Sequence, residues 1–442
     1  MTDSKVYRLE LLPREIPPAG RNDRQRIIMK LLFLLLLLPL LTCAQVPPTL
    51  PLDSVLSAVL RQNPQLRQYD AQIKAADAYV AGARGWEAPQ VAAGPFMRPY
   101  SPGQGMDEAA PMSKGSIMVT TTQMVPNPAR QRAQTQYLQS RGAVDVANRA
   151  TALNQLRADV KLNYYNWLMI SNKLHVLEAT ESLMEFVIRS IELRYKYGGS
   201  KLSDAYRAKA ALLQHHAEEM ELEGQWKEAR ANLNTLMNRD PQTPFEIDTT
   251  YHLRLLDRSL DTAELATTRH DVQALDQQLV RNSRQLALER TARLPEFGVQ
   301  YSHMNTLAAG SPNQYSLMGM VSLPFVPWAA RQYKANLAGL GLEAQALRAQ
   351  RAALVSQAAG RVEAINARRR AKFAQVQMYQ EEIVPMLLKS YRATLLAYEQ
   401  NTEDLTAVLQ AWESLRTGRL ETVNQEQELL RLQVEFEREQ EQ

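Results

Sequence analysis

The chain has 442 residues, of which 45% are hydrophobic and 22% are charged, and its formal net charge is +4. Seven of the 51 basic and four of the 47 acidic residues lie in residues 1–44, which leaves 44 basic against 43 acidic residues in the rest of the chain. This balance does not indicate a nucleic-acid partner. The single cysteine, Cys43, excludes disulfides within the chain and cysteine-rich zinc sites.

The N-terminus has the pattern of an export signal. Met29 and Lys30 precede an apolar run of eleven residues, 31–41, which small residues follow as far as Ala44. The run is shorter than the roughly 20 residues that span a bilayer, and no longer apolar stretch follows, which argues against a helical membrane protein. We interpret residues 1–44 as a signal peptide, with Met29 as an alternative translation start. We favour cleavage after Ala44; the alternative is cleavage before Cys43, which would allow lipidation of that thiol.

A seven-residue motif occurs twice in the chain, as VPNPARQ at 125–131 and as VPWAARQ at 326–332. Each copy follows a run in which small, apolar and hydroxyl residues alternate, and precedes a long stretch rich in Ala, Gln, Arg and Leu. Proline cannot donate to a β-ladder but is tolerated in the first turn of a helix. Each motif therefore predicts a junction at which a strand passes into a long helix. The junction residues are Pro126 and Pro128 in the first copy, and Pro327 and Trp328 in the second.

The first half of the chain, 45–245, begins with a helical pattern that extends from 52 to about 85 and is interrupted at Asn63-Pro64. Alternating residues then predict a β-hairpin over 90–125, with strands at 90–97 and 116–125.

The stretch from 129 to 240 has 112 residues without proline and only four glycines. It predicts a helix from 129 to 197, roughly 100 Å long at 1.5 Å per residue, and a return helix that ends near Met237. The turn between them is expected at 198–204. Gly198 and Gly199 would supply left-handed backbone there, and Ser203 is the predicted N-cap of the return helix.

The second half, 246–442, repeats this order. It predicts a short helix at 263–293, a hairpin at 296–325, a long helix, a turn at 401–406 and a return helix. The turn motif of the first half, Tyr195, Gly198, Leu202 and Ser203, matches Tyr398, Asn401, Leu405 and Thr406 in the second. The strand starts, the junction motifs and the turn motifs occur in the same order in both halves, at a nearly constant separation in sequence, which indicates an internal duplication. Pro385 has no counterpart in the first half and predicts a local kink.

The predicted fold is mainly α with a small β part, in which two long α-hairpins and four strands belong to each chain. Four strands cannot close a barrel, and open edges in lipid would leave backbone groups unpaired, so several chains must pool their strands. At these residues the sequence resembles the TolC family of outer-membrane efflux channels. The resemblance covers nearly the whole chain after the signal and depends on the repeat, Asn63-Pro64, the two junctions and the two turns.

The resemblance implies a homotrimer in the outer membrane whose twelve pooled strands form a lipid-embedded barrel and whose helices form an α-barrel in the periplasm. The channel would be a passive conduit for small molecules, drugs or heavy metals, docked on a periplasmic adaptor (membrane fusion) protein and an inner-membrane pump. The turns would form the periplasmic tip and the adaptor contact, with the expected residues Tyr195, Gly198, Gly199, Leu202, Ser203, Asp204, Tyr398, Asn401, Leu405 and Thr406. Alternatives are the outer-membrane component of a type I protein secretion system and a periplasmic coiled-coil adaptor.

Two positions depart from the family pattern. Members carry acidic residues just beyond the second turn, where this chain has Ala407 and Gln410. Asp204, Glu403 and Asp404 lie near the turns and could substitute, although carboxylates at helix ends are the simpler interpretation.

No motif predicts an enzyme, a cofactor or a metal centre. The pair His215-His216 is a weak metal candidate, and we interpret it as a surface pair. A group of methionines in the hairpin regions could bind copper(I) or fill apolar positions; its members are Met97, Met106, Met112, Met118, Met124, Met304, Met318 and Met320.

Overall fold

The computed structural model describes residues 48–98, 100, 115–251, 261–307, 310–324 and 326–441. The predicted signal peptide with Met29 and Cys43 lies outside the described residues, as do Met106, Met112 and Phe325. The chain divides into two compact units, of which the larger comprises 50–243 and 247–442. This unit holds both predicted repeats. Two-residue strands, β1 (Thr49–Leu50) and β4 (Glu246–Ile247), lie where the units divide.

Within the described residues the first half contributes four helices to the larger unit, and their breaks fall at residues that favour such breaks. Asn63 separates α2 (Leu52–Gln62) from α3 (Pro64–Gly82) and accepts a hydrogen bond from the Gln65 N–H at 2.9 Å, as an N-cap before proline does. The long helix α4 spans Pro128–Lys196, 69 residues, and the return helix α5 spans Leu202–Leu236.

In the second half the predicted single helix at 263–293 is wrong, because Arg269 divides it. The parts are α6 (Thr262–Thr268) and α7 (His270–Thr291), and Arg269 between them has extended backbone. Its buried guanidinium donates to the carbonyl oxygen of Glu439 at 2.9 Å and to the Glu439 carboxylate at 2.7 Å. The helix break at Arg269 is therefore accompanied by an ion pair with a distant residue, and not by a proline or glycine in the sequence.

The long helix of the second half is interrupted, unlike α4. It comprises α8 (Pro327–Met378), a π-helical turn η2 (Tyr379–Ile383) and α9 (Val384–Glu399), and α10 (Leu405–Glu439) returns. Pro385 lies just after η2. Because proline has no N–H and its ring crowds the carbonyl of the residue four positions earlier, a wider turn before it relieves the strain.

The two halves repeat tertiary contacts as well as elements. Arg149 of α4 binds Asp70 of α3 at 2.7 Å, and Arg351 of α8 binds Asp276 of α7 at 2.7 Å. The two helix breaks also correspond: Asn63 donates to the carbonyl oxygen of Leu236 at 3.1 Å, at the end of α5, as Arg269 does at the end of α10.

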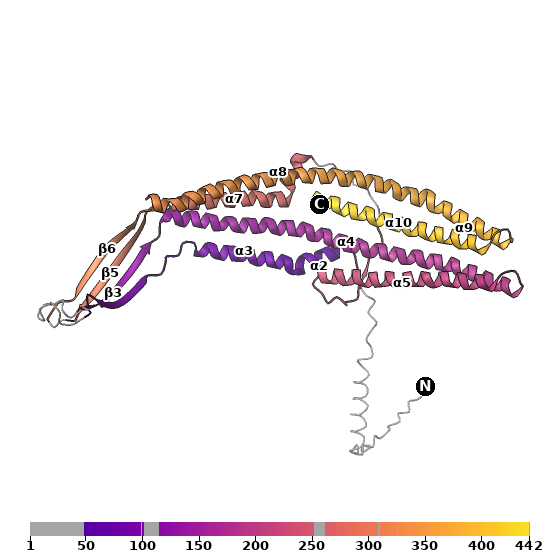
Figure 1. Ribbon diagram of the computed structural model, residues 1–442, viewed down its shortest axis with the longest axis horizontal. Coiled ribbons are helices and arrows are strands. Elements are labelled where there is room, and N and C mark those ends of the chain that lie inside the picture. Colours follow the sequence, from indigo (N-terminus) through magenta and orange to yellow (C-terminus); the bar gives the residue numbers. More distant parts are fainter. Residues whose placement is uncertain are drawn as a thin grey trace, which may run out of the picture. The chain divides into compact units, whose positions relative to one another are not determined.

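Helix α4 is the element against which most others pack. It contacts α3 and α5 from its own half, and α7 and α10 from the other, while α8 packs on α7 and α10 (Figure 1). Fully buried side chains such as Trp167, Leu168 and Met169 lie along its middle. Among the described residues, no helix has both the length and the apolar composition that a membrane crossing requires.

One four-stranded antiparallel sheet is formed by strands from both halves. Its order is β2 (Gln90–Phe96), β3 (Ser116–Val125), β5 (Glu296–Thr306), β6 (Gln314–Ser322). The pairing of β3 with β5 joins the two hairpins, and Thr121 lies opposite Tyr301. In the described part of the chain β2 and β6 are therefore edge strands.

Candidate functional site

The first turn joins α4 to α5 and reverses the chain with one left-handed residue. Gly198 has φ 76°, and the Gly199 N–H donates to the carbonyl oxygen of Arg194 at 2.8 Å, which satisfies an acceptor left over at the helix end. Gly199 has no positive φ, so the expectation that both glycines supply left-handed backbone is wrong for Gly199.

The predicted N-cap at Ser203 is also wrong, because α5 begins at Leu202 and Ser203 lies inside it. The backbone N–H of Lys201 donates to the Asp204 carboxylate at 3.3 Å. A carboxylate at the third helical position can satisfy an unpaired N–H at the helix start. This contact accompanies a helix that starts at Leu202, two residues earlier than a cap at Ser203 would imply.

The second turn has the same geometry with a different residue. Asn401 has φ 61° at the position that matches Gly198, and the Thr402 N–H donates to the carbonyl oxygen of Ala397 at 2.9 Å. Asn is the side-chain-bearing residue that best tolerates this region. Asp404 caps α10 by accepting from the Ala407 N–H at 3.0 Å, so Thr406 is not the cap.

Arg194, which sequence reasoning missed, connects the two turns. Its guanidinium donates to the carbonyl oxygen of Tyr398 at 2.6 Å, to the side-chain oxygen of Asn401, and to the carbonyl oxygen of Gly199 at 3.4 Å. It also lies over the Tyr398 ring, 4.4 Å from the centroid, a cation–π contact. The only sequence signal for this role is a basic residue in the last turn of a helix.

A second contact and an apolar cluster support the turns. Arg207 donates to the Thr406 hydroxyl at 3.1 Å. Beneath the turns, buried side chains of α4, α5, α9 and α10 form one cluster: Met184, Val187, Ile188, Ile191, Ala205, Ala208, Tyr391, Tyr398, Leu405, Val408, Trp412 and Leu415. Burial raises the pKa of Tyr398, so its hydroxyl stays neutral at physiological pH. The turn residues expected from the two halves therefore lie close together, above this buried apolar cluster.

The outer side of the first turn is aromatic and exposed. Tyr197 is 84% exposed, and Tyr195, Leu202 and Tyr206 are also exposed. The carboxylates considered as substitutes differ: Asp204 and Asp404 are helix caps, whereas Glu403 is exposed at the second turn. Two of the three thus have the simpler role that the sequence suggested.

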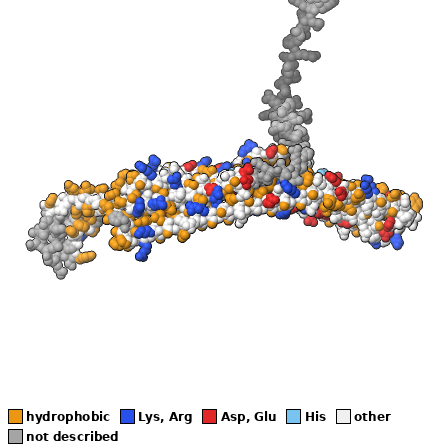
Figure 2. Space-filling view, turned by 90° about the horizontal axis from the view of Figure 1, so that it is seen from above, with side chains coloured by type: hydrophobic (Ala, Val, Ile, Leu, Met, Phe, Trp, Pro, Cys, Tyr) orange, Lys and Arg blue, Asp and Glu red, His pale blue; other side chains and the backbone are white. Residues whose placement is uncertain are grey.

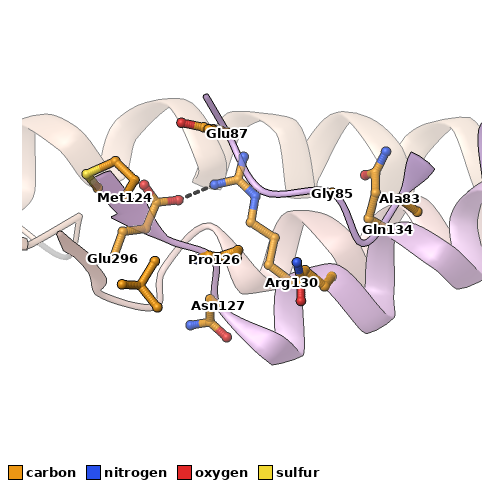
Figure 3. A pocket seen from close by; sticks show the side chains of 11 residues that line it. Ala83, Gly85, Glu87, Met124, Pro126, Asn127, Arg130, Gln134 and Glu296 are labelled. Atoms are coloured by element: carbon orange, nitrogen blue, oxygen red, sulfur yellow. Dashed lines mark hydrogen bonds and ion pairs between the residues drawn. The ribbon is translucent and has the colours of Figure 1, made fainter. Parts of the chain in front are cut away.

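The first strand-to-helix junction lines a pocket to which the second half contributes Glu296 (Figure 3). Asn127 caps α4 by accepting from the Ala129 N–H at 2.9 Å, with Pro128 as the first helical residue and Pro126 before the cap. Arg130 pairs with Glu296 at the start of β5 (Figure 3). At the second junction Pro327 is the first residue of α8, and Trp328 is 80% exposed.

The histidine pair on α5 is not a surface pair, which corrects the prediction. His215 is buried, its Nε2 donates to the carbonyl oxygen of Leu177 at 3.0 Å, and its ring lies 5.8 Å from that of Trp412. His216 is half-buried, and its Nε2 lies 2.6 Å from a carboxylate oxygen of Glu181 on α4.

Five methionines of the described strands share one face of the sheet, because each is, or lies opposite, an alternate residue of β5 between Gly298 and Met304. Met118 and Met304 lie opposite each other on β3 and β5, while Met124 and Met320 both lie opposite Gly298, one on each side of β5. Met318 lies opposite Gln300, and Met97 follows β2 with a positive φ.

Comparisons with known proteins agree with this architecture. Residues 55–239 match the family model described as outer membrane efflux protein, so the similarity expected from the sequence is confirmed. No curated protein matches the chain.

Solved structures match over most of the chain. The outer-membrane channel OprN has a TM-score of 0.72 at 18% identity and covers 88% of this chain and 89% of its own. VceC of Vibrio cholerae has a TM-score of 0.69 at 16% identity, with 88% and 95% covered. MtrE of Neisseria gonorrhoeae, solved in its open state, has a TM-score of 0.68 at 18% identity, with 88% of each chain covered. At such identities the likeness establishes the fold.

Proposed function

From the match of residues 55–239 to the outer membrane efflux protein family model, we propose that the chain is the outer-membrane channel of a tripartite efflux system. Three copies would form a passive conduit for small molecules, such as drugs or heavy metals, across the periplasm and the outer membrane. The energy for transport would come from an inner-membrane pump, reached through a periplasmic adaptor protein.

The observation that carries the proposal is an open-edged sheet whose exposed face is apolar. Hydrophobic side chains gather over the sheet (Figure 2). The exposed members include Val91, Ile117, Val119, Phe297, Val299, Tyr301, Tyr315, Leu317 and Val321. The other face carries polar side chains, such as Thr120 and Ser302, which share a hydrogen bond of 3.0 Å, together with the methionines of the strands. A predominantly apolar face opposite a face with polar side chains is the pattern of a strand between lipid and an aqueous lumen.

Unpaired edges support pooling of strands. Because β2 and β6 end the sheet, a single chain would leave a row of backbone donors and acceptors open in lipid, at several kcal/mol for each. Pairing β6 of one copy with β2 of the next removes both edges, and three copies give twelve strands.

The matched turns support a docking end at the far ends of the helices. Helix α4 has 69 residues, roughly 100 Å at 1.5 Å per residue, and the turns lie at the end opposite the sheet (Figure 1). We infer that the two turns and their exposed aromatic side chains form the periplasmic entrance and the adaptor contact.

Cysteine cross-linking between the edge strands tests the proposal. Val91, Thr121, Tyr301 and Leu317 lie in one row across the sheet. A Val91→Cys substitution on β2 would be combined with cysteine at Tyr315, Leu317 or Gly319 on β6, in a Cys43→Ser background, in outer-membrane vesicles.

A disulfide forms only when the two Cα atoms lie within about 7 Å, so at least one of the three pairs is expected to give linked dimers and trimers. The single-cysteine variants are the controls and are expected to give neither. Absence of covalent trimer in all three pairs would contradict the pooled barrel.

A further inference from the structure

A cluster of one imidazole and two carboxylates lies between α4 and α5, away from the turns and the junctions. Glu181 belongs to α4, whereas His216 and Glu219 lie three residues apart on one face of α5. Their potential ligand atoms all lie within 4.8 Å of one another, and all three residues are half-buried. We propose that these residues form a site for a divalent transition metal of the zinc type, which would clip α4 to α5.

The donor set suits that class of metal. Imidazole nitrogen and carboxylate oxygen are the ligands that Zn²⁺ takes alongside thiolate, and three protein ligands with one water complete its usual tetrahedron. Ligand atoms about 2.0 to 2.2 Å from a shared zinc are about 3.3 to 3.6 Å apart in a tetrahedron, so rotation of the glutamate side chains would be enough to close the site.

Glu219 is the residue that a simple ion pair leaves unexplained. His216 and Glu181 already form a pair at 2.6 Å. Glu219 makes no hydrogen bond or ion pair with any other residue that the structure describes, although its neighbour Glu218 pairs with Arg416. A half-buried carboxylate without a partner carries a desolvation cost, and a shared cation would offset it.

The site is also held in place by its neighbour. His215 is buried and donates to the Leu177 carbonyl oxygen of α4 at 3.0 Å, which fixes the register of α5 against α4 directly beside His216. Ligands on rigid, packed helices need little ordering when a metal binds.

Zinc titration of the full-length protein tests the proposal. The protein would be purified in detergent without a polyhistidine tag and stripped with EDTA, and Zn²⁺ binding would be followed by calorimetry, with Co²⁺ absorption as a second readout of ligand geometry. We expect one saturable Zn²⁺ per chain. Glu219→Gln is expected to weaken binding by at least about 100-fold, the upper end of what loss of a supporting residue typically costs, and to change the visible Co²⁺ spectrum.

His216→Gln should act in the same direction, but it also removes the pair with Glu181. Glu219→Gln is therefore the decisive variant, since it disturbs no bond among the described residues. Glu178→Gln is the matched control: His175 and Glu178 form a comparable pair at 3.6 Å on α4, exposed and without a third ligand, and binding should not change. No saturable Zn²⁺ binding, or equal binding by the native protein and Glu219→Gln, would overturn the proposal.

Discussion

At the scale of single residues, Arg194 makes the contact that joins the two halves at the turns. It donates to the Tyr398 carbonyl and to Asn401 of the other half. Hydrogen bonds of a charged donor each contribute about 1.5 to 3 kcal/mol to stability, so their loss should lower the local stability of the turns.

We predict that Arg194→Ala loosens both turns without affecting the sheet. Hydrogen exchange measured by mass spectrometry should show lower protection at 195–204 and 396–404 and unchanged protection in the strands. Arg189→Ala is the control, because the one ion pair that Arg189 makes with a described residue is an exposed pair with Glu185 within α4. Equal exchange in both variants would show that Arg194 does not hold the turns.

Gly198 gives the second residue-scale prediction. Its φ of 76° costs a residue with a side chain about 1 to 2 kcal/mol. Gly198→Val is expected to distort the turn, so that export and cross-linking to the adaptor fall while the amount of outer-membrane trimer stays normal.

Gly198→Asn is the matched control, since Asn401 adopts φ 61° at the equivalent position; it should retain export. Gly199→Ala should also be tolerated, because Gly199 has no positive φ and an added Cβ would meet the Arg194 carbonyl oxygen at an ordinary 3.5 Å. Loss of the trimer in Gly198→Val would instead assign the turn to the assembly core.

At the scale of elements, the contact of α5 with α4 and α10 depends on a neutral histidine. Burial lowers the pKa of His215 below its usual value of 6.5, and Arg416 lowers it further, while the Leu177 carbonyl, Glu181 and Glu218 act in the opposite direction. Nδ1 of His215 has no hydrogen-bond partner among the residues that the structure describes. A second proton on the ring would therefore be buried beside a guanidinium without an acceptor.

Stability in this region should consequently depend on pH. The unfolded chain binds more protons than the folded one between the lowered pKa and 6.5, so the stabilisation is complete above about 6.5 and is lost as the pH falls through the folded pKa. We expect helix amides near His215 to lose exchange protection between pH 7.5 and pH 5.5, measured with EDTA present. His215→Gln, which can still donate to the Leu177 carbonyl, should show a weaker dependence; identical pH profiles would exclude His215 as the cause.

At the scale of the whole molecule, the two edge strands predict assembly. Light scattering on the detergent-solubilised protein should give the mass of three chains, because the proposed pairing of β2 with β6 between copies would satisfy both edges. A stable monomer with intact β-structure in circular dichroism would contradict this.

The sequence predicted the elements best where proline and glycine mark their ends. The long helix expected at 129–197 is found at Pro128–Lys196 because Asn127-Pro128 starts it and Gly198 ends it. The break at Arg269 and the role of Arg194 were missed, since each depends on a partner some 170 to 207 positions away, and local patterns carry no information about such contacts.

The π-helical turn before Pro385 has a mechanical consequence. Helix α4 is continuous, whereas its counterpart contains a turn with wider hydrogen-bond spacing at 379–383, and such turns are places where helices kink. The two hairpins of a chain therefore differ in bending stiffness. In the proposed trimer, six hairpins around the tube would alternate between a stiff and a compliant type, and the tube would deform with threefold rather than sixfold symmetry.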